Sequence, residues 1–396
     1  MTAQKSSNVA ALQPSATLAV AARAREMAAQ GRDIVDLSAG EPDFDTPDFA
    51  AEAGIDAIRN GRTRYTAAAG MPELRRAIAA DLSRAAGREI DPLGVVVTAG
   101  AKQALFNTIF TLFGPADKVL VPAPYWTSYP ALVHLSRAEP VTVETDEAGG
   151  FKLTVADLDA ARDDDVRGLI LNSPSNPTGA VYSLDELRAV ADWARERGVW
   201  IVSDEIYSRL CYIADRAPGL LDLDAKYMER AVLIDGASKL FAMTGWRIGF
   251  SYSSNALASS MGAVQSHMTS NAATPSQHAA LAAYTGDPMQ RPQVREMVAR
   301  FAHRRDLVCR LFREHLPDVQ FPTPEGAFYL FFRVDSFFHD GAADSVALCA
   351  RILEDAGVAL VPGAAFGDDR YVRMSYATSE ERIEEGVRRI AGALRG

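Results

Sequence analysis

Short runs of apolar residues alternate with helical patterns through the middle of the chain. Several of these runs are apolar throughout, without the polar alternation of a half-exposed strand, and they occupy residues 95–100, 118–124, 168–174, 199–205 and 231–239. Strands that are buried on both faces have this composition, so the runs predict a parallel sheet that is covered by helices. The sequence therefore predicts an α/β fold with a large, doubly wound, mostly parallel sheet domain.

The pattern also predicts three parts along the chain. Residues 46–290 contain the apolar runs and would form the large domain. After about residue 290 a long helical pattern leads into mixed strands and helices, which predicts a smaller α+β domain over residues 291–396. We expect residues 1–45 to form an N-terminal arm and a surface helix that pack with the small domain.

Composition and charge narrow the function classes. The 396 residues carry a formal net charge of −10, which argues against a nucleic acid or a membrane surface as the main partner. No stretch of 18 apolar residues occurs, so no membrane span is expected. The three cysteines, Cys211, Cys309 and Cys349, are far apart and form no CxxC pair. We therefore expect no disulfide framework, no metal site and a cytoplasmic location.

Polar residues that follow the apolar runs are the candidates for chemistry, because ligands bind at the carboxyl ends of strands in open α/β sheets. Lys239 ends one run, where desolvation would lower the pKa of its amine and favour imine formation. Arg247 follows in TGWRIG and could hold a phosphate by paired hydrogen bonds. A lysine or an arginine in such a position, taken singly, is more often a surface residue. The combination of Lys239 with Arg247 eight residues later indicates a phosphate-bearing ligand more specifically than either residue alone.

A second group follows two other runs. Asp204 could keep a cofactor's pyridine nitrogen protonated, and Tyr207 could donate to the cofactor's phenolate oxygen. A helix N-cap is the alternative for Asp204. Asn176, in SPSNPTG, could bond the same oxygen or belong to a plain turn.

Other candidates are weaker on their own. Ala101 and Lys102 open a helix after a glycine, where backbone N–H groups can bind an anion. Trp126 could stack on a flat ring or belong to the core, and Tyr65 lies in a polar loop. Arg373 lies on a predicted strand and requires a carboxylate partner, either a substrate or, as we favour from this residue alone, an internal acid.

The motifs of the chain, taken together and in order, resemble those of the fold-type-I pyridoxal-phosphate-dependent aminotransferases. Within that family the chain is similar to the bacterial aspartate aminotransferase branch, which also contains aspartate/prephenate aminotransferases. The similarity covers nearly the whole chain through the segments LQPSATLAV, LSAGEPDFDTP, RYTAAAGMPELR, TAGAKQALFN, PYWTSYP, NSPSNPTGAVY, VSDEIY, GASKLFAMTGWRIG, EGAFYLF, VPGAAFG and VRMSYATS.

The resemblance implies a role for each candidate near the cofactor. Lys239 would carry pyridoxal 5′-phosphate as a Schiff base and, once released, move a proton between substrate and cofactor. Asp204 would pair with the pyridinium nitrogen, and Asn176 and Tyr207 would hold the phenolate oxygen. Arg247 would hold the phosphate.

The resemblance also implies further cofactor contacts. The N–H groups near Ala101 and Lys102 would assist at the phosphate, where Ser238 is a further candidate. Trp126 would stack over the ring. Tyr65 would reach the phosphate of the partner subunit, which implies a homodimer with shared active sites.

The substrate contacts follow in the same way. Gly40 and Arg373 would bind the α-carboxylate, with Asn176 and Trp126 nearby. The acidic side chain of the substrate would be bound by a second group of residues, namely Lys102, Ser15 and Thr17.

The chain departs from the family pattern at two positions. Relatives that accept prephenate often have a basic residue where this chain has Gln13, and some relatives have a phosphate-binding serine where it has Gly236.

The expected activity is therefore ping-pong transamination between L-aspartate and 2-oxoglutarate, with amino and 2-oxo acids as the small-molecule partners. The alternatives keep the scaffold and change the chemistry: transamination of prephenate, aromatic or neutral amino acids, or a β-lyase reaction. A cofactor-binding regulator and an inactive scaffold are alternatives of another class. The net negative charge argues against the regulator. The inactive scaffold is disfavoured because the chain has the full set of candidate residues, namely Lys239, Asp204, Arg247 and Arg373.

Overall fold

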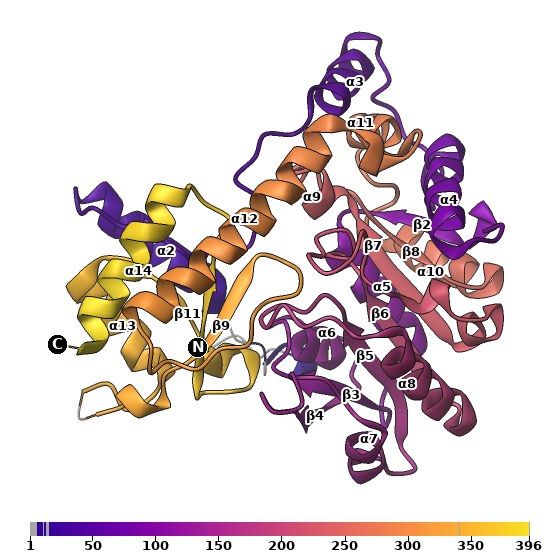
Figure 1. The fold of residues 1–396 in the computed structure, drawn as a ribbon. Helices are drawn as coiled ribbons and strands as arrows, with labels where there is room; N and C mark the ends of the chain where they lie inside the picture. The colour runs from indigo at the N-terminus through magenta and orange to yellow at the C-terminus, as the bar shows by residue number, and fades with distance from the viewer. Residues whose placement is uncertain (1–5, 11, 13–15, 340, 396) are drawn as a thin grey trace.

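The computed structural model describes residues 6–10, 12, 16–339 and 341–395 (Figure 1). The α-helices in these residues are α1 Ser7–Ala10, α2 Ala16–Ala29, α3 Asp48–Arg59, α4 Pro72–Ala86, α5 Ala101–Leu112, α6 Tyr129–Leu135, α7 Val155–Ala161, α8 Leu184–Arg197, α9 Ala237–Leu240, α10 Asn255–Met268, α11 Thr274–Tyr284, α12 Pro292–His315, α13 Ser345–Ala356 and α14 Glu380–Arg395. The strands are β1 Val35–Asp36, β2 Val95–Thr98, β3 Lys118–Ala123, β4 Glu139–Glu144, β5 Val166–Asn172, β6 Trp200–Asp204, β7 Ala231–Gly236, β8 Gly249–Tyr252, β9 Tyr329–Arg333, β10 Val358–Ala359, β11 Val361–Pro362 and β12 Tyr371–Ser375.

The large sheet has seven strands in the order β2-β8-β7-β6-β5-β3-β4. All five apolar runs supply strands to it, and the sheet is parallel except at β8, which pairs antiparallel with both β2 and β7. This confirms the predicted α/β class with a mostly parallel sheet. The pattern did not predict β4 or β8. Strand β4 lies at the sheet edge and is partly exposed, and β8 is only four residues long and begins with glycine.

Helices cover both faces of this sheet, because alternate residues of each strand enter different cores. Leu169 and Leu171 of β5 pack in a cluster with α4, α8 and α11. Ile170, between them, packs in a second cluster with α5, α6 and α10. The strands are therefore buried on both faces, as their apolar composition indicated.

Local signals fix the ends of the helix between β5 and β6. Ser183 caps the N-terminus of α8 by accepting from the N–H of Glu186, whose side chain in turn accepts from the N–H of Ser183. The helix ends at Gly198, whose φ of 69° lies in the left-handed region. This short crossover brings β5 and β6 side by side in parallel.

A smaller α+β unit follows. Strands β11, β12 and β9 form an antiparallel sheet, and α12, α13 and α14 share its core. The N-terminal β1 pairs with β10 of this region, with Val35 opposite Val358, and Figure 1 shows α2 beside α13 and α14. The boundaries near residues 45 and 290 stay predictions.

None of the helices in the described ranges combines the length and apolarity that crossing a membrane requires. Those ranges also contain no group of three or more His, Cys, Asp or Glu side chains that could hold a metal ion.

Candidate active site

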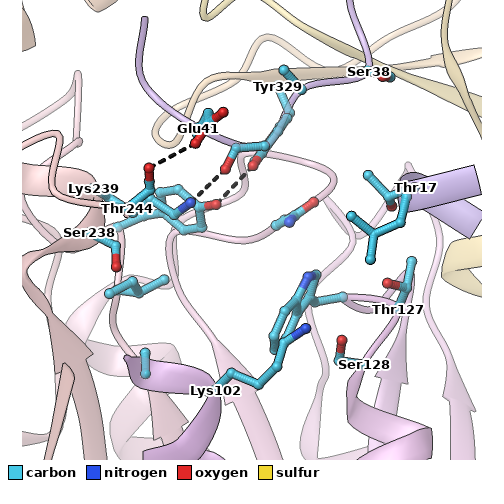
Figure 2. A pocket seen from close by; sticks show the side chains of 18 of the residues that line it. Thr17, Ser38, Glu41, Lys102, Thr127, Ser128, Ser238, Lys239, Thr244 and Tyr329 are labelled. Atoms are coloured by element: carbon cyan, nitrogen blue, oxygen red, sulfur yellow. Dashed lines mark hydrogen bonds between the residues drawn. The ribbon is translucent and has the colours of Figure 1, made fainter. Parts of the chain in front are cut away.

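A pocket of about 480 Å³ lies where the carboxyl ends of the large sheet meet the small sheet and α2. It is lined by nearly all the predicted site residues, namely Thr17, Gly40, Ala101, Lys102, Trp126, Asn176, Asp204, Tyr207, Ser238, Lys239, Arg247 and Arg373. Tyr65 does not line it, and its side chain is 89% exposed. Ser15 and Gln13 lie outside the described residues. Figure 2 shows Lys239 and Thr17 on opposite sides of the pocket, with Lys102 between them at its base.

Lys239 lies in α9, directly after β7. Its Nζ donates to the backbone oxygen of Gly40 at 2.5 Å. Burial lowers the pKa of Lys239 to about 8, although the carboxylate of Glu41 opposes this shift. A lysine with a lowered pKa keeps a larger neutral fraction near neutral pH, and the neutral amine is the form that attacks a carbonyl carbon.

Asp204 ends β6 at the base of the pocket and is 4% exposed. The hydroxyl of Tyr129 donates to its Oδ2 at 2.8 Å, and the N–H of Ile206 donates to Oδ1 at 3.2 Å. Burial raises the pKa of Asp204 to about 6, and the hydrogen bond from Tyr129 opposes the rise. The helix N-cap alternative is wrong, because the residues that follow form turns.

Arg373 lies on β12 with 2% of its surface exposed. Its guanidinium donates to Oδ1 of Asn176 at 3.0 Å and to the backbone oxygen of Ser38 at 2.8 Å. It also stacks over the ring of Tyr329, 4.3 Å from the centroid. Among the described residues no carboxylate pairs with Arg373, and its buried Nε has no hydrogen-bond partner. The internal ion pair that we favoured from the sequence is therefore wrong.

The hydroxyl of Tyr207 is paired with that of Tyr329 at 2.8 Å. Burial raises the pKa of Tyr207 well above its ordinary value, so the phenol is neutral and can donate a hydrogen bond. Nearby, the backbone N–H of Asn176 donates to Oδ1 of Asn172 at 2.8 Å, which fixes the turn after β5. Asn176 follows β5 and Tyr207 follows the neighbouring β6, and both line the pocket.

The N-terminus of α5 and Arg247 form a cradle for an anion. The first N–H groups of a helix have no intrahelical acceptor, and here they belong to Ala101 and Lys102. Gly100 precedes them with a φ of 83°, and a Cβ there would lie 2.5 Å from Nη2 of Arg247. Glycine therefore allows the guanidinium to approach the helix N-terminus.

Steric contacts also explain why position 236 is a glycine. A Cβ on this residue would lie 2.8 Å from both the Cα of Gly249 and the backbone oxygen of Ile248. A serine at this position does not fit the backbone of this chain. Ser238, two residues later, is buried and lines the pocket.

Lys102 and Trp126 lie together on another wall of the pocket. The Nζ of Lys102 lies 4.9 Å from the centroid of the Trp126 ring. Burial and the nearby charge of Arg247 lower the pKa of Lys102. Thr17 of α2 faces the same space from the opposite side (Figure 2).

Several pocket residues were not predicted from the sequence: Tyr129, Tyr329, Ser38, Glu41 and Thr244. Each belongs to a segment that carried the resemblance. The contacts of Tyr129 with Asp204, of Tyr329 with Tyr207 and of Glu41 with Thr244 join segments that are far apart in sequence, and no local pattern indicates such pairings.

Comparison with known proteins places the chain in a family. The sequence profile of the family "Aminotransferase class I and II" matches residues 32–390. An aspartate aminotransferase of Streptomyces avermitilis is 42% identical over 98% of this chain and 96% of its own length. An aspartate/prephenate aminotransferase of Cereibacter sphaeroides is also 42% identical, over 99% of this chain and 98% of its own length.

The solved structures agree. An aspartate aminotransferase from Thermus thermophilus with maleate superposes with a TM-score of 0.93 at 39% identity, over 99% of this chain and 100% of that one. An aspartate aminotransferase from Thermotoga maritima superposes with a TM-score of 0.92 at 37% identity, over 99% of this chain and 100% of its own length. The fold and the site thus define a fold-type-I enzyme. The chain belongs to the class I and II aminotransferases, whose substrates are amino acids and 2-oxo acids.

Proposed function

We propose that this enzyme uses pyridoxal 5′-phosphate to exchange an amino group between L-aspartate and 2-oxoglutarate. The observation that carries the proposal is Arg373, a buried guanidinium without a carboxylate partner among the described residues, which lines the same pocket as the amine of Lys239. A buried unpaired charge is costly, so a substrate carboxylate is the partner that this site requires.

The residues of the pocket fit the cofactor. Arg247 and the N-terminus of α5 form a positively charged cradle that suits a phosphate. Asp204 offers a buried carboxylate to a protonated ring nitrogen. When bound, pyridoxal phosphate supplies a carbonyl carbon for imine formation and an electron sink for the substrate's α-carbanion. Trp126, Tyr207 and Asn176 would hold the ring between these two ends.

The protein groups divide the remaining work. Lys239, with its lowered pKa, would accept and return the α-proton. Arg373 would fix the α-carboxylate by a two-pronged contact, with Gly40 and Asn176 beside it. Because the pocket lies between the two sheets, closing them together would exclude water from these groups.

Lys102 supports the choice of an acidic substrate. Its amine is separate from Arg373, and Thr17 faces it across the space, while Arg25 of α2 is a further cation on the pocket lining. Two cationic groups suit a dicarboxylate such as aspartate. The curated relatives named above carry the same substrate in their names, and some also carry prephenate, which remains the second candidate.

We further infer a homodimer with shared active sites. Tyr65 is 89% exposed and does not line the pocket of its own chain. An exposed tyrosine of this kind suits a contact with a second subunit. In the dimer it would reach the phosphate of the partner's site.

The test is an absorption spectrum of the purified protein with the cofactor. Addition of L-aspartate alone should convert the band of the lysine-bound cofactor to that of its amino form, and 2-oxoglutarate should restore it. Lys239→Ala should lack the first band. Discharge by a neutral or aromatic amino acid but not by aspartate would refute the substrate, and an unchanged spectrum in Lys239→Ala would refute the role of the lysine.

A further inference from the structure

A segment of four residues, 38–41, contacts distant parts of the pocket at once. The backbone oxygen of Ser38 accepts from Arg373, and that of Gly40 accepts from Lys239 at 2.5 Å. Arg373 of the small sheet and Lys239 of α9, which follows β7 of the large sheet, therefore both contact this segment, which we call the strap.

Glu41, the last residue of this strap, makes a third contact. The hydroxyl of Thr244 donates to Oε2 of Glu41 at 2.7 Å, and Nη1 of Arg247 donates to the backbone oxygen of Thr244 at 3.0 Å. Figure 2 shows Glu41, Thr244 and Lys239 grouped on one side of the pocket. A chain of hydrogen bonds thus connects the strap to the arginine of the anion cradle.

Glu41 also acts on the charge of Lys239. Two carboxylates, those of Glu41 and Asp204, raise the pKa of this amine. Two guanidinium groups, those of Arg373 and Arg247, oppose this rise together with burial. Of the two carboxylates, Glu41 has the larger effect on Lys239.

We propose that Glu41 is a positioning residue for Lys239: held by Thr244, its carboxylate keeps the Gly40 carbonyl on the lysine Nζ and places a negative charge beside that amine. The inference deepens the proposed function and rests on the role of Lys239. An amine that must hold a proton between two transfers benefits from a fixed acceptor and a nearby negative charge.

The chain offers matched variants to separate charge from hydrogen bonding. Glu41→Gln removes the charge and keeps an oxygen acceptor for Thr244. Thr244→Val removes the donor and keeps the charge, and Thr244→Ser restores a hydroxyl. Asp45→Asn is the control, because Asp45 is an exposed carboxylate close to the strap that does not line the pocket.

The first measurement is the pH dependence of Lys239 acetylation by acetic anhydride in the full-length protein without cofactor, read by peptide mass spectrometry. In Glu41→Gln the midpoint should fall by about half a pH unit, as for a partly screened neighbouring charge. Asp45→Asn should leave it unchanged. An unchanged midpoint in Glu41→Gln, or an equal shift in Asp45→Asn, overturns the proposal.

The second measurement is amide hydrogen exchange of a peptide of residues 38–46, which contains the strap, in the same proteins. Thr244→Val should raise exchange over residues 38–46 several-fold, Thr244→Ser should restore it, and Glu41→Gln should change it less. Equal exchange in all variants overturns the positioning role. Neither measurement needs turnover. The role of Glu41 can therefore be refuted while the spectrum with L-aspartate supports the proposed function. Equally, L-aspartate can fail to change the spectrum while both measurements support the role of Glu41.

Discussion

The hydroxyl of Tyr129 donates a 2.8 Å hydrogen bond to Oδ2 of Asp204 in the base of the pocket. The two residues lie 75 positions apart, on α6 and at the end of β6. Asp204 is buried, and this bond opposes the rise in the pKa of its carboxyl that burial causes. Tyr129 therefore helps to keep ionised the carboxylate that would pair with the cofactor's ring nitrogen.

Tyr129→Phe should weaken cofactor binding in a pH-dependent way. The pKa of Asp204 is about 6, so binding that needs the carboxylate should fall as the pH drops through 6. Loss of a hydrogen bond to a charged group, worth about 1.5–3 kcal/mol, should move this fall upward by about one to two pH units. Titration of pyridoxal phosphate by protein fluorescence between pH 5 and 9 measures the shift. A loss of affinity that is equal at all pH values would contradict it.

Arg373→Ala should lower kcat/KM for L-aspartate by about 10²- to 10³-fold, the cost of losing a buried charged contact of roughly 3–4 kcal/mol. Arg373→Lys keeps the charge but loses the planar fork, so it should recover only part of the activity. Steady-state kinetics gives the values, and circular dichroism checks the fold. Full activity in Arg373→Lys would show that the two-pronged geometry is not required.

Lys102→Ala should reduce the preference for acidic over neutral amino donors by about 5- to 150-fold, since a partly buried ion contact contributes about 1–3 kcal/mol. The relevant quantity is the ratio of kcat/KM for L-aspartate to that for L-alanine. If the ratio is unchanged while both values fall, Lys102 serves the cofactor and not the substrate side chain.

Glu205→Gln should stabilise the protein above neutral pH. Burial raises the pKa of Glu205 to about 7 from an ordinary 4.5. A carboxyl with a raised pKa in the folded state stabilises fully below pH 4.5, and this contribution, roughly 3 kcal/mol, is lost as the pH rises through 7. Glutamine is neutral at every pH and keeps an acceptor for Ser203 and the N–H of Leu220.

Urea unfolding of both proteins at pH 5 and pH 8 tests this. The free energy of unfolding of Glu205→Gln should exceed that of the parent protein at pH 8, with a smaller difference at pH 5. A difference that does not depend on pH would mean that packing, not ionisation, decides the effect.

Five strands of the large sheet and the segments that line the pocket could be predicted from the sequence alone. Buried strands must be apolar, so the five runs were visible without any tertiary information. Lys239, Asp204 and Asn176 follow such runs, and parallel strands carry their carboxyl ends to one edge of the sheet. Local composition was less informative for β8, because a four-residue strand that starts with glycine has almost no pattern.

Which side chains face one another could not be predicted from the sequence. Taken alone, Arg373 favoured an internal acid as its partner, and only the side chains around it in the structure overturned that prediction. The contacts of Tyr129 with Asp204 and of Glu41 with Thr244 join segments 75 and 203 residues apart. Such pairings depend on how the sheets and loops pack, because a side chain's hydrogen-bond partner is set by distance in space, whereas local sequence sets only the element that carries it.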